Sequence, residues 1–329
     1  MRAFVTGATG FLGGVLARKL RERGDEVVAL VRSPSRASGL QELRCEMVPG
    51  DLGDEAALSA GTAGADAVFH VAAMYKVGVP ASMREEMIEA NVRGTERVMD
   101  AAASAGVKRI VYVSTVGAFG NTHGKVVDEM FVRRPGDWLS LYDETKYLAH
   151  EVVKERIAAG APAIIVMPGG IYGPGDQSDL ANFLEQLRKG RLKMFVFPDT
   201  GFNFVHVEDA ADGILLAHDR GRVGETYVLG GQLTSVREAI VTAATLYGRK
   251  PPRFTLPPVV AKASIPVWPL VARFAGMGPN LRELIRAADG VTYWATDEKA
   301  RRELGYAPRE LATGLRQTIE AERGATAGG

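Results

Sequence analysis

Short runs of β-branched residues alternate with longer helical patterns through the first two-thirds of the chain, and this alternation constrains the fold more than any other feature. The strand-like runs are Arg2–Val5, Glu26–Val31, Glu46–Val48, Ala67–Val71, Arg109–Val113 and Ala163–Met167. Helical patterns lie between them, for example at Gly13–Arg23, Ser82–Ala105 and Leu141–Ala159. Strands joined by helical crossovers run parallel and are covered on both faces. The sequence therefore predicts an α/β fold with a doubly wound parallel sheet.

The alternation weakens beyond about Gly175, which indicates a second structural unit. The turn-like segment 198–201 and an apolar, Pro-rich stretch from Leu256 to Pro279 lie in this part of the chain. We therefore expect a sheet-containing domain over residues 1–174, to which residues 202–232 return. Residues 175–201 and 233–321 are expected to form a smaller lobe over the carboxyl edge of the sheet, and residues 322–329 a flexible tail.

Charge and cysteine content exclude several classes of function. Lys and Arg number 40 against 39 Asp and Glu, without a basic stripe, so no nucleic-acid partner is expected. Cys45 is the single cysteine and cannot form an intramolecular disulfide, which favours a reducing compartment. Prolines and charges interrupt the most apolar stretch, so no membrane span is expected, and with no targeting segment a cytoplasmic location is the default. The histidines show no metal-ligand spacing, so we expect no metal site.

Glycine is over-represented, with 38 residues, and part of this excess marks a binding turn. Gly7, Gly10 and Gly13 directly follow the first strand and open the first helix. Glycines in such a turn let a pyrophosphate approach the backbone, and the N–H groups of the helix then face the phosphates. This context predicts that a Rossmann-type domain binds a dinucleotide cofactor. The other residues of the turn that we expect at the cofactor are Thr9, Phe11 and Leu12.

The end of the second strand indicates which dinucleotide is bound. NAD-binding folds usually place an acidic residue there to hold the ribose hydroxyls. Here Val31 takes that place and Arg32 follows, and a guanidinium favours a 2′-phosphate because it can bind one bidentately. Arg36 is a second candidate for this role. The alternative is that Arg32 merely pairs with Asp51 or Asp54 on the surface. We predict NADP(H), with NAD(H) less favoured.

Short motifs form one ordered series over residues 1 to about 230. They are Thr6–Gly13, Gly50–Leu52, His70–Ala73, Asn91–Thr95, Tyr142–Lys146, Pro168–Gly175 and Val205–Ala211. The series resembles the extended short-chain dehydrogenase/reductase family, within the NAD-dependent epimerase/dehydratase superfamily. Asp199–Ala217 and the second strand most resemble the dihydroflavonol-4-reductase-like subgroup. Met167 departs from the family, which more often has Arg there, and this weakens the case for a sugar-nucleotide substrate.

The resemblance implies further cofactor contacts and an assembly. The family's adenine, ribose and nicotinamide contacts correspond here to Asp51, Leu52, Val71, Ala72, Ala73, Asn91, Ser114, Pro168, Gly170 and Ile171. It also implies that Lys146 holds the nicotinamide ribose. A homodimer formed by two helices per subunit is implied as well, and those helices would be Ser82–Ala105 and Leu141–Ala159.

Tyr142 and Lys146 are the candidate acid–base pair. They lie four residues apart in a helical pattern, so their side chains point the same way. We expect the neighbouring ammonium and a positively charged nicotinamide to lower the pKa of the phenol from its free value near ~10. By analogy with the family, Thr115 takes the hydroxyl that bonds the substrate oxygen and Ser114 supports it. The alternatives are a helix-surface pair and two hydroxyls that merely end a strand.

Together these residues predict an NADP-dependent oxidoreductase that reduces a ketone or aldehyde of a small, fairly apolar substrate, with Tyr142 protonating the oxygen. The apolar stretch Leu256–Met277 favours such a substrate, and Tyr75, Thr115 and Tyr172 are its candidate contacts. One alternative is a sugar-nucleotide epimerase or dehydratase that uses the same tyrosine and lysine with a retained cofactor. The other is a non-enzymatic NADP sensor, against which the intact pair argues.

Overall fold

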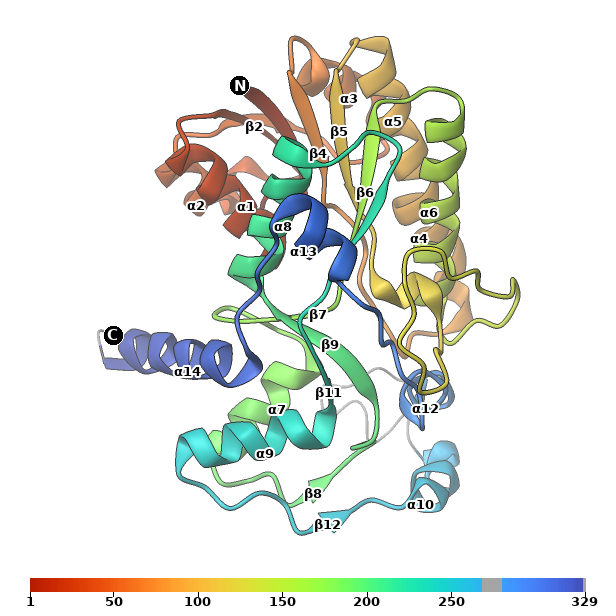
Figure 1. Cartoon of the computed structure of the whole chain (residues 1–329), viewed down its shortest axis with the longest axis vertical. Helices are drawn as coiled ribbons and strands as arrows, with labels where there is room; N and C mark the ends of the chain where they lie inside the picture. The colour runs from red at the N-terminus through yellow and green to blue at the C-terminus, as the bar shows by residue number, and fades with distance from the viewer. Residues whose placement is uncertain (268–279, 328–329) are drawn as a thin grey trace.

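The computed structural model describes residues 1–267 and 280–327, and a parallel sheet forms its larger part. The seven strands lie in the order β10-β6-β5-β4-β1-β2-β3 (Figure 1). Their bounds are β1 Arg2–Thr6, β2 Glu26–Val31, β3 Glu46–Pro49, β4 Ala67–His70, β5 Arg109–Val113, β6 Ala163–Pro168 and β10 Thr226–Leu229. Every pair of neighbours in this sheet is parallel. The expected Rossmann-type α/β fold is confirmed.

Helices cover both faces of this sheet because its strands are apolar on both sides. One face packs against α1 (Phe11–Glu22) and α8 (Val207–Arg220). The other packs against α3 (Glu55–Thr62), α5 (Gly94–Ser104) and α6 (Leu141–Ala158), as Figure 1 shows. Short helical segments complete this part at η1 Pro34–Arg36, α2 Ser38–Glu42, η2 Ala81–Met83 and η4 Val116–Phe119.

The helix expected over Ser82–Ala105 is interrupted. It consists of α4 (Arg84–Ile88), one π-helical segment, η3 (Glu89–Arg93), and α5. A π-helical turn carries one extra residue and is common at functional sites. Here it contains Asn91, whose side-chain bonds are described below.

The smaller lobe stands at the carboxyl edge of the sheet (Figure 1). Its three-stranded sheet has the order β11-β9-β7, and a separate strand pair joins β12 to β8. The strands are β7 Gly170–Tyr172, β8 Met194–Phe195, β9 Gly201–His206, β11 Gln232–Ser235 and β12 Phe254–Thr255. The helices are α7 Asp179–Arg188, α9 Val236–Tyr247, α10 Pro258–Ala263, η5 Ile265–Val267, α12 Leu281–Ala288 and α14 Leu311–Ala327.

Several domain boundaries differ from those expected. The segment that returns to the larger part is shorter than the expected 202–232, since β9 and β11 belong to the sheet of the small lobe. Only α8, which packs on the large sheet, and β10, which is one of its strands, return to it. Helix α13 (Glu298–Leu304) packs on α8 in the larger part, because Ala300 and Leu304 are buried in its core. Residues 322–327 continue α14 instead of forming a tail, and 328–329 lie outside the described residues. Within the described ranges, no helix has the length and apolarity to span a bilayer.

Candidate active site

The glycine turn between β1 and α1 has no room for side chains at two positions. Gly7 has a φ of +77°, and a Cβ there would lie 2.7 Å from the backbone nitrogen of Ala72. A Cβ on Gly13 would lie 2.1 Å from the carbonyl oxygen of Gly7. The turn therefore packs tightly against the end of β4 while its backbone remains bare.

The first turn of α1 is electrostatically suited to an anion. Its N-cap, Gly10, offers no side chain to bond the free N–H groups, and the first turn carries no acidic residue. Thr9 and Gly10 are exposed, whereas Leu12 is buried in the core and Phe11 is half-buried. Unpaired helix N–H groups and the positive end of the helix dipole attract phosphate. These residues fit the pyrophosphate of a dinucleotide.

Arg32 lies beside this turn and is free to contact a ligand. Leu30 of β2 is in register with Thr6 of β1, so the residues that follow each strand are neighbours. Arg32 and Arg36 are exposed, and Arg32 has no ion pair within the described part of the chain. Its expected alternative partners are engaged locally. Asp51 accepts a hydrogen bond from Gly53 N at 2.8 Å, and Asp54 caps α3 through Ala57 N at 2.9 Å.

Tyr142 and Lys146 both project from the first two turns of α6. The side chain of Ser140 caps this helix by accepting a hydrogen bond from Asp143 N at 3.1 Å. Lys146 is buried and turns toward β5, where its Nζ donates to Val113 O at 2.9 Å and to the Tyr112 hydroxyl at 3.4 Å. Tyr142 is half-buried, and its ring meets that of Tyr75 edge-to-face with centroids 4.7 Å apart.

Burial changes the proton affinities of both members of this pair. Burial lowers the pKa of Lys146 from 10.5 to about 7. Burial also raises the pKa of Tyr142 above its ordinary value, with smaller contributions from neighbouring acidic groups. The Lys146 ammonium is directed at Val113 and Tyr112. Tyr142 therefore holds its proton at neutral pH, as a general acid must. The expected lowering belongs to a site that also holds a positively charged nicotinamide, and it stays a prediction.

The two hydroxyls after β5 face different surroundings. Thr115 is half-buried and caps η4, because its Oγ1 accepts a hydrogen bond from Gly117 N at 3.1 Å. Ser114 is buried, and its Oγ lies 3.0 Å from Nδ1 of His150. Of the two, Thr115 is thus the one that retains access to a substrate, whereas Ser114 is occupied inside the protein.

Tyr112 is a residue of this site that sequence reasoning missed. It is fully buried in β5. Its hydroxyl accepts a hydrogen bond from the Lys146 ammonium and faces the hydroxyls of Thr95 and Ser114. The signal for it was the two-residue period of a strand, which places Tyr112 and Ser114 on one face. A tyrosine in a buried strand otherwise resembles ordinary core.

Asn91 and His70 form a buried polar network behind the lysine. The side-chain oxygen of Asn91 accepts a hydrogen bond from Met74 N at 2.6 Å, and its side-chain nitrogen donates to Met74 O at 3.1 Å. The same nitrogen donates to Thr145 Oγ1 at 2.9 Å. His70 lies 2.7 Å from Thr6 Oγ1 and 3.0 Å from Thr95 Oγ1. Burial lowers the pKa of His70 to about 3, so it remains neutral. Asn91 therefore joins the segment after β4 to α6, and its polar atoms are already used.

A buried ion pair anchors the start of α6. Arg133 contacts both carboxylate oxygens of Asp143, at 2.6 and 2.7 Å, and also donates to the carbonyl of Asp137. Its guanidinium lies 4.7 Å from the centroid of the Trp138 ring. Because Asp143 directly follows Tyr142, this pair fixes the loop before α6 against the helix that carries the phenol.

The two candidate substrate tyrosines lie in different environments. Tyr75 is 62% exposed and lies beside Tyr142, so it can contact a substrate. Tyr172 is 1% exposed, and its hydroxyl donates to Leu311 O at 3.4 Å within the core of the smaller lobe. The expectation of a substrate contact at Tyr172 is therefore corrected, since the apolar contacts of β7 with β9 and α14 bury it.

The remaining predicted cofactor residues follow the carboxyl ends of the strands. Asp51 and Leu52 come after β3, and Val71, Ala72 and Ala73 directly after β4. Pro168 ends β6, and Gly170 and Ile171 lie in β7. Because these ends meet at one edge of a parallel sheet, the structure brings this set to the side of the sheet that bears the glycine turn. Their contacts with a cofactor stay a prediction.

Comparisons with known proteins agree with this architecture. A family model described as "NAD dependent epimerase/dehydratase family" matches residues 3–230. A putative dihydroflavonol 4-reductase from Synechocystis is 36% identical over 77% of this chain and 75% of its own length. The 4-hydroxy-2-methyl-3-oxo-4-farnesyl-3,4-dihydroquinoline-1-oxide ketoreductase of Stigmatella aurantiaca is 33% identical over 99% of this chain and 98% of its own.

Solved structures extend the similarity over the whole chain. The crystal structure of gox2253 is 36% identical and superposes with a TM-score of 0.84, covering 98% of both chains. MoeE5 in complex with UDP-glucose and NAD is 25% identical, with a TM-score of 0.78 over 99% of this chain and 100% of that one. The shared sheet, the glycine turn and the match over residues 3–230 lead to one assignment. The chain belongs to the NAD dependent epimerase/dehydratase family.

Proposed function

We propose that this oxidoreductase uses NADPH to reduce a carbonyl group on a small, fairly apolar substrate. The observation that carries the proposal is the half-buried Tyr142, whose raised pKa keeps the phenol protonated next to the exposed ring of Tyr75. A protonated phenol can give its proton to a carbonyl oxygen as that oxygen gains charge. Relatives that are named reductase and ketoreductase support the direction of the reaction.

A bound NADPH would supply the hydride that reaches the carbonyl carbon. Thr115 would orient the carbonyl by donating a hydrogen bond to its oxygen, and Tyr142 would transfer its proton to that oxygen. Lys146, held by Val113 O, would bind the nicotinamide ribose and return positive charge to the site as the phenolate forms. The product is an alcohol, and the phenol is restored by a proton from solvent.

The preference for NADP over NAD rests on Arg32. It is exposed beside the glycine turn, and the place of the ribose-binding carboxylate is taken by Val31. Arg32→Ala should weaken NADPH binding by about 10- to 100-fold, the effect of losing a charge-assisted hydrogen bond, and leave NADH binding unchanged. Arg134→Ala, at another exposed arginine, is the matched control. An unchanged ratio of the two affinities in Arg32→Ala would remove this residue from the proposal.

The apolar substrate class rests on Tyr75 and on the composition of the smaller lobe. Tyr75 presents an exposed aromatic ring next to the phenol. The apolar stretch Leu256–Met277 is described only to Val267, and residues 268–277 lie outside the described residues. Tyr75→Ala should raise KM for apolar ketones more than it lowers kcat, because the ring binds the substrate and does no chemistry.

Consumption of NADPH with a panel of ketones and aldehydes tests the reaction. Stoichiometric oxidation is expected, and Tyr142→Phe should lower kcat by about 10²- to 10⁴-fold, the usual contribution of a general acid. A second candidate is a sugar-nucleotide epimerase or dehydratase, which the structural similarity to MoeE5 with UDP-glucose and NAD favours. Turnover of UDP-sugars with a retained cofactor and no net oxidation would support it and overturn the reductase.

The assembly and location also remain proposals. A homodimer would use α4, α5 and α6, which cover the predicted ranges Ser82–Ala105 and Leu141–Ala159. Sedimentation equilibrium of the purified chain tests it, and a monomer at micromolar concentration would refute it.

The proposed location is the cytoplasm, because NADPH and the reduced, buried Cys45 are both expected in that compartment.

A further inference from the structure

The charges of this chain are distributed unevenly in the smaller lobe. The whole sequence is nearly balanced, yet it contains no Asp or Glu from Ala239 to Arg282. The basic residues in that interval are Arg249, Lys250, Arg253, Lys262, Arg273 and Arg282. The proposed reduction uses none of these charged side chains, so they need a separate explanation.

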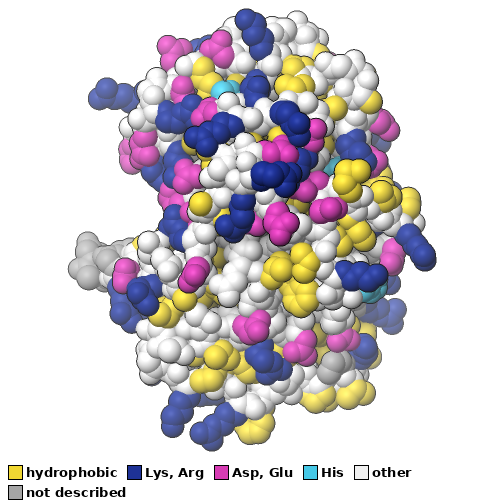
Figure 2. Space-filling view, viewed as in Figure 1, with side chains coloured by type: hydrophobic (Ala, Val, Ile, Leu, Met, Phe, Trp, Pro, Cys, Tyr) yellow, Lys and Arg dark blue, Asp and Glu magenta, His cyan; other side chains and the backbone are white. Residues whose placement is uncertain are grey.

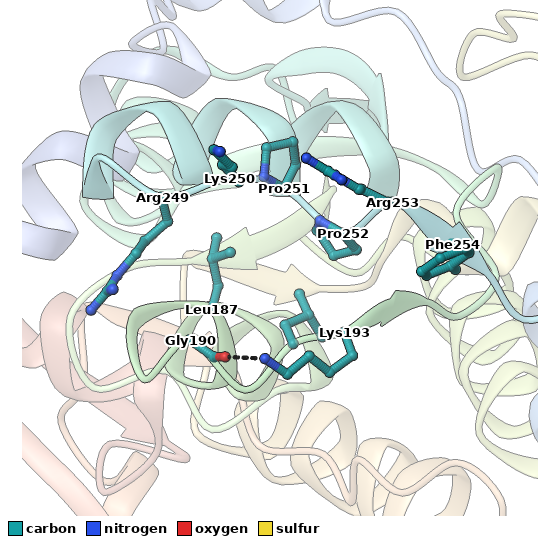
Figure 3. Close-up of a pocket in the computed structure, with 10 residues that line it drawn as sticks. Leu187, Gly190, Lys193, Arg249, Lys250, Pro251, Pro252, Arg253 and Phe254 are labelled. Atoms are coloured by element: carbon teal, nitrogen blue, oxygen red, sulfur yellow. Dashed lines mark hydrogen bonds between the residues drawn. The ribbon is translucent and has the colours of Figure 1, made fainter.

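The structure gathers part of this charge at the end of the molecule opposite the large sheet. That end holds β8, β12 and α10, and Figure 2 shows dark-blue and yellow side chains along the same lower margin. A shallow hollow of about 340 Å³ lies there (Figure 3). We call the cationic side chains that line it the basic face, which comprises Lys193, Arg249, Lys250 and Arg253.

The basic face is not neutralised by the protein. Lys193 Nζ donates to Gly190 O at 2.9 Å, and Arg249 Nη2 donates to Arg188 O at 3.3 Å, so both bond only backbone carbonyls. Across the described ranges 1–267 and 280–327, no residue of the basic face forms an ion pair with a carboxylate. All four are exposed, and their charge is therefore available to an external anion.

Apolar side chains project next to these cations. Phe254 is 72% exposed, and Met194 is opposite to it in the β8–β12 pair, so the two lie on one face of that ribbon. Val259 is 71% exposed at the start of the adjacent α10, and Val260 is also exposed. Large apolar side chains that cluster at the surface of a soluble protein indicate an interaction site.

We propose that this end of the smaller lobe docks on an anionic lipid bilayer. Cations beside projecting apolar groups fit such a surface, since the bases meet lipid phosphates while Phe254 and Val259 enter the acyl boundary. A small soluble anion would leave the apolar groups unused. A second copy of the same face would bring like charges together. This inference does not depend on the proposed reductase activity.

The docking surface is connected to the candidate active site by packing. Ala261 of α10 packs with Leu281 and Ile285 of α12. On the same helix, Glu283 accepts a hydrogen bond from Leu141 N at 2.9 Å, directly before Tyr142. Helix α12 therefore contacts both α10, at the proposed docking surface, and the start of α6, which carries Tyr142.

Vesicle flotation of the purified full-length chain tests the proposal. We expect binding to vesicles of equal phosphatidylglycerol and phosphatidylcholine, and none to phosphatidylcholine alone. Each base near an anionic surface is worth about fivefold in affinity, so K250E/R253E should lose at least ~25-fold. F254S should bind several-fold more weakly, because it loses the inserted ring. K108E/R316E, which reverses two exposed charges elsewhere, is the matched control and should bind like the wild type.

The outcomes separate docking from simpler explanations. Loss in K250E/R253E and F254S with retention in K108E/R316E supports the proposal, provided circular dichroism and NADPH affinity are unchanged. Equal binding by all variants, or equal loss in the control, overturns it, and so does failure of the wild type to float. If F254S alters the sedimentation coefficient and not the vesicle binding, a second copy of the chain covers this face and the bilayer is refuted.

Discussion

Lys146→Met should raise the free energy of unfolding of the protein measured without cofactor. The same substitution should abolish turnover when NADPH is supplied. In the folded protein, burial lowers the pKa of Lys146 from 10.5 to about 7, so the buried ammonium is disfavoured by about 5 kcal/mol. Methionine fills a similar volume without charge. It also loses the hydrogen bonds from Nζ to Val113 O and the Tyr112 hydroxyl, worth about 2–3 kcal/mol for a charged donor. The expected gain at pH 6 is therefore roughly 2–3 kcal/mol in the free energy of unfolding.

The stability gain from Lys146→Met should depend on pH, because Lys146 titrates at a lower pH in the folded chain than in the unfolded chain. Below pH 7, Lys146 is protonated in both the folded and the unfolded chain, and the full cost of burial is present. Between about pH 7 and 10.5 only the unfolded chain holds the proton, so wild-type stability rises with pH. The gain from Lys146→Met should therefore be largest near pH 6 and should shrink steadily toward pH 10.

Urea unfolding at pH 6, 8 and 9.5 measures the effect, with Lys154→Met as the control. Lys154 lies on the same helix, is 54% exposed and pairs with Glu151, so its loss should change stability by less than about 0.5 kcal/mol at every pH. Destabilisation of Lys146→Met at pH 6, or a gain independent of pH, would refute the reasoning. Loss of turnover together with higher stability would show that the site holds this cation at the expense of stability.

Two further substitutions test the ion pair and the turn. Arg133→Met leaves the buried Asp143 without its partner and should cost about 3–5 kcal/mol in urea unfolding, whereas Arg134→Met, at the exposed neighbour, should change it by less than about 0.5 kcal/mol. Equal effects of the two would contradict the assigned pair. Gly13→Ala should abolish cofactor binding in calorimetry, because its Cβ would lie 2.1 Å from a carbonyl oxygen of the turn. Gly14→Ala, whose Cβ meets its nearest atom at 3.5 Å, should bind normally, and loss there would point to the helix and not to the turn.

Local sequence patterns predicted the strands and helices of the large sheet well. Glu26–Val31 and Arg109–Val113 are strands with the predicted bounds, and Leu141–Ala159 is a helix to within one residue. These segments carry their own signals, because β-branched runs and helical periodicity depend only on neighbours in the chain. The glycine turn was readable for the same reason, since close approach of the backbone requires glycine at fixed positions.

Sequence patterns gave wrong predictions where contacts between residues distant in the chain determine the local structure. The interruption of Ser82–Ala105 at Asn91 follows from its bonds to Met74 and Thr145, which lie in other elements. The packing role of Tyr172 follows from burial against β9 and α14. Contacts of this kind have no periodic signature in the sequence.

The sequence by itself determined the parallel α/β order, the phosphate turn and the spacing of Tyr142 and Lys146, since each depends on residues close together in the chain. Only the tertiary structure decided which atoms the lysine meets and which way the proton affinities shift. Those shifts arise from desolvation by β5 and α6, which are brought together from separate parts of the chain. The same is true of the basic face, because folding brings Lys193 and Lys250 to one hollow, with no carboxylate of the described chain paired to either.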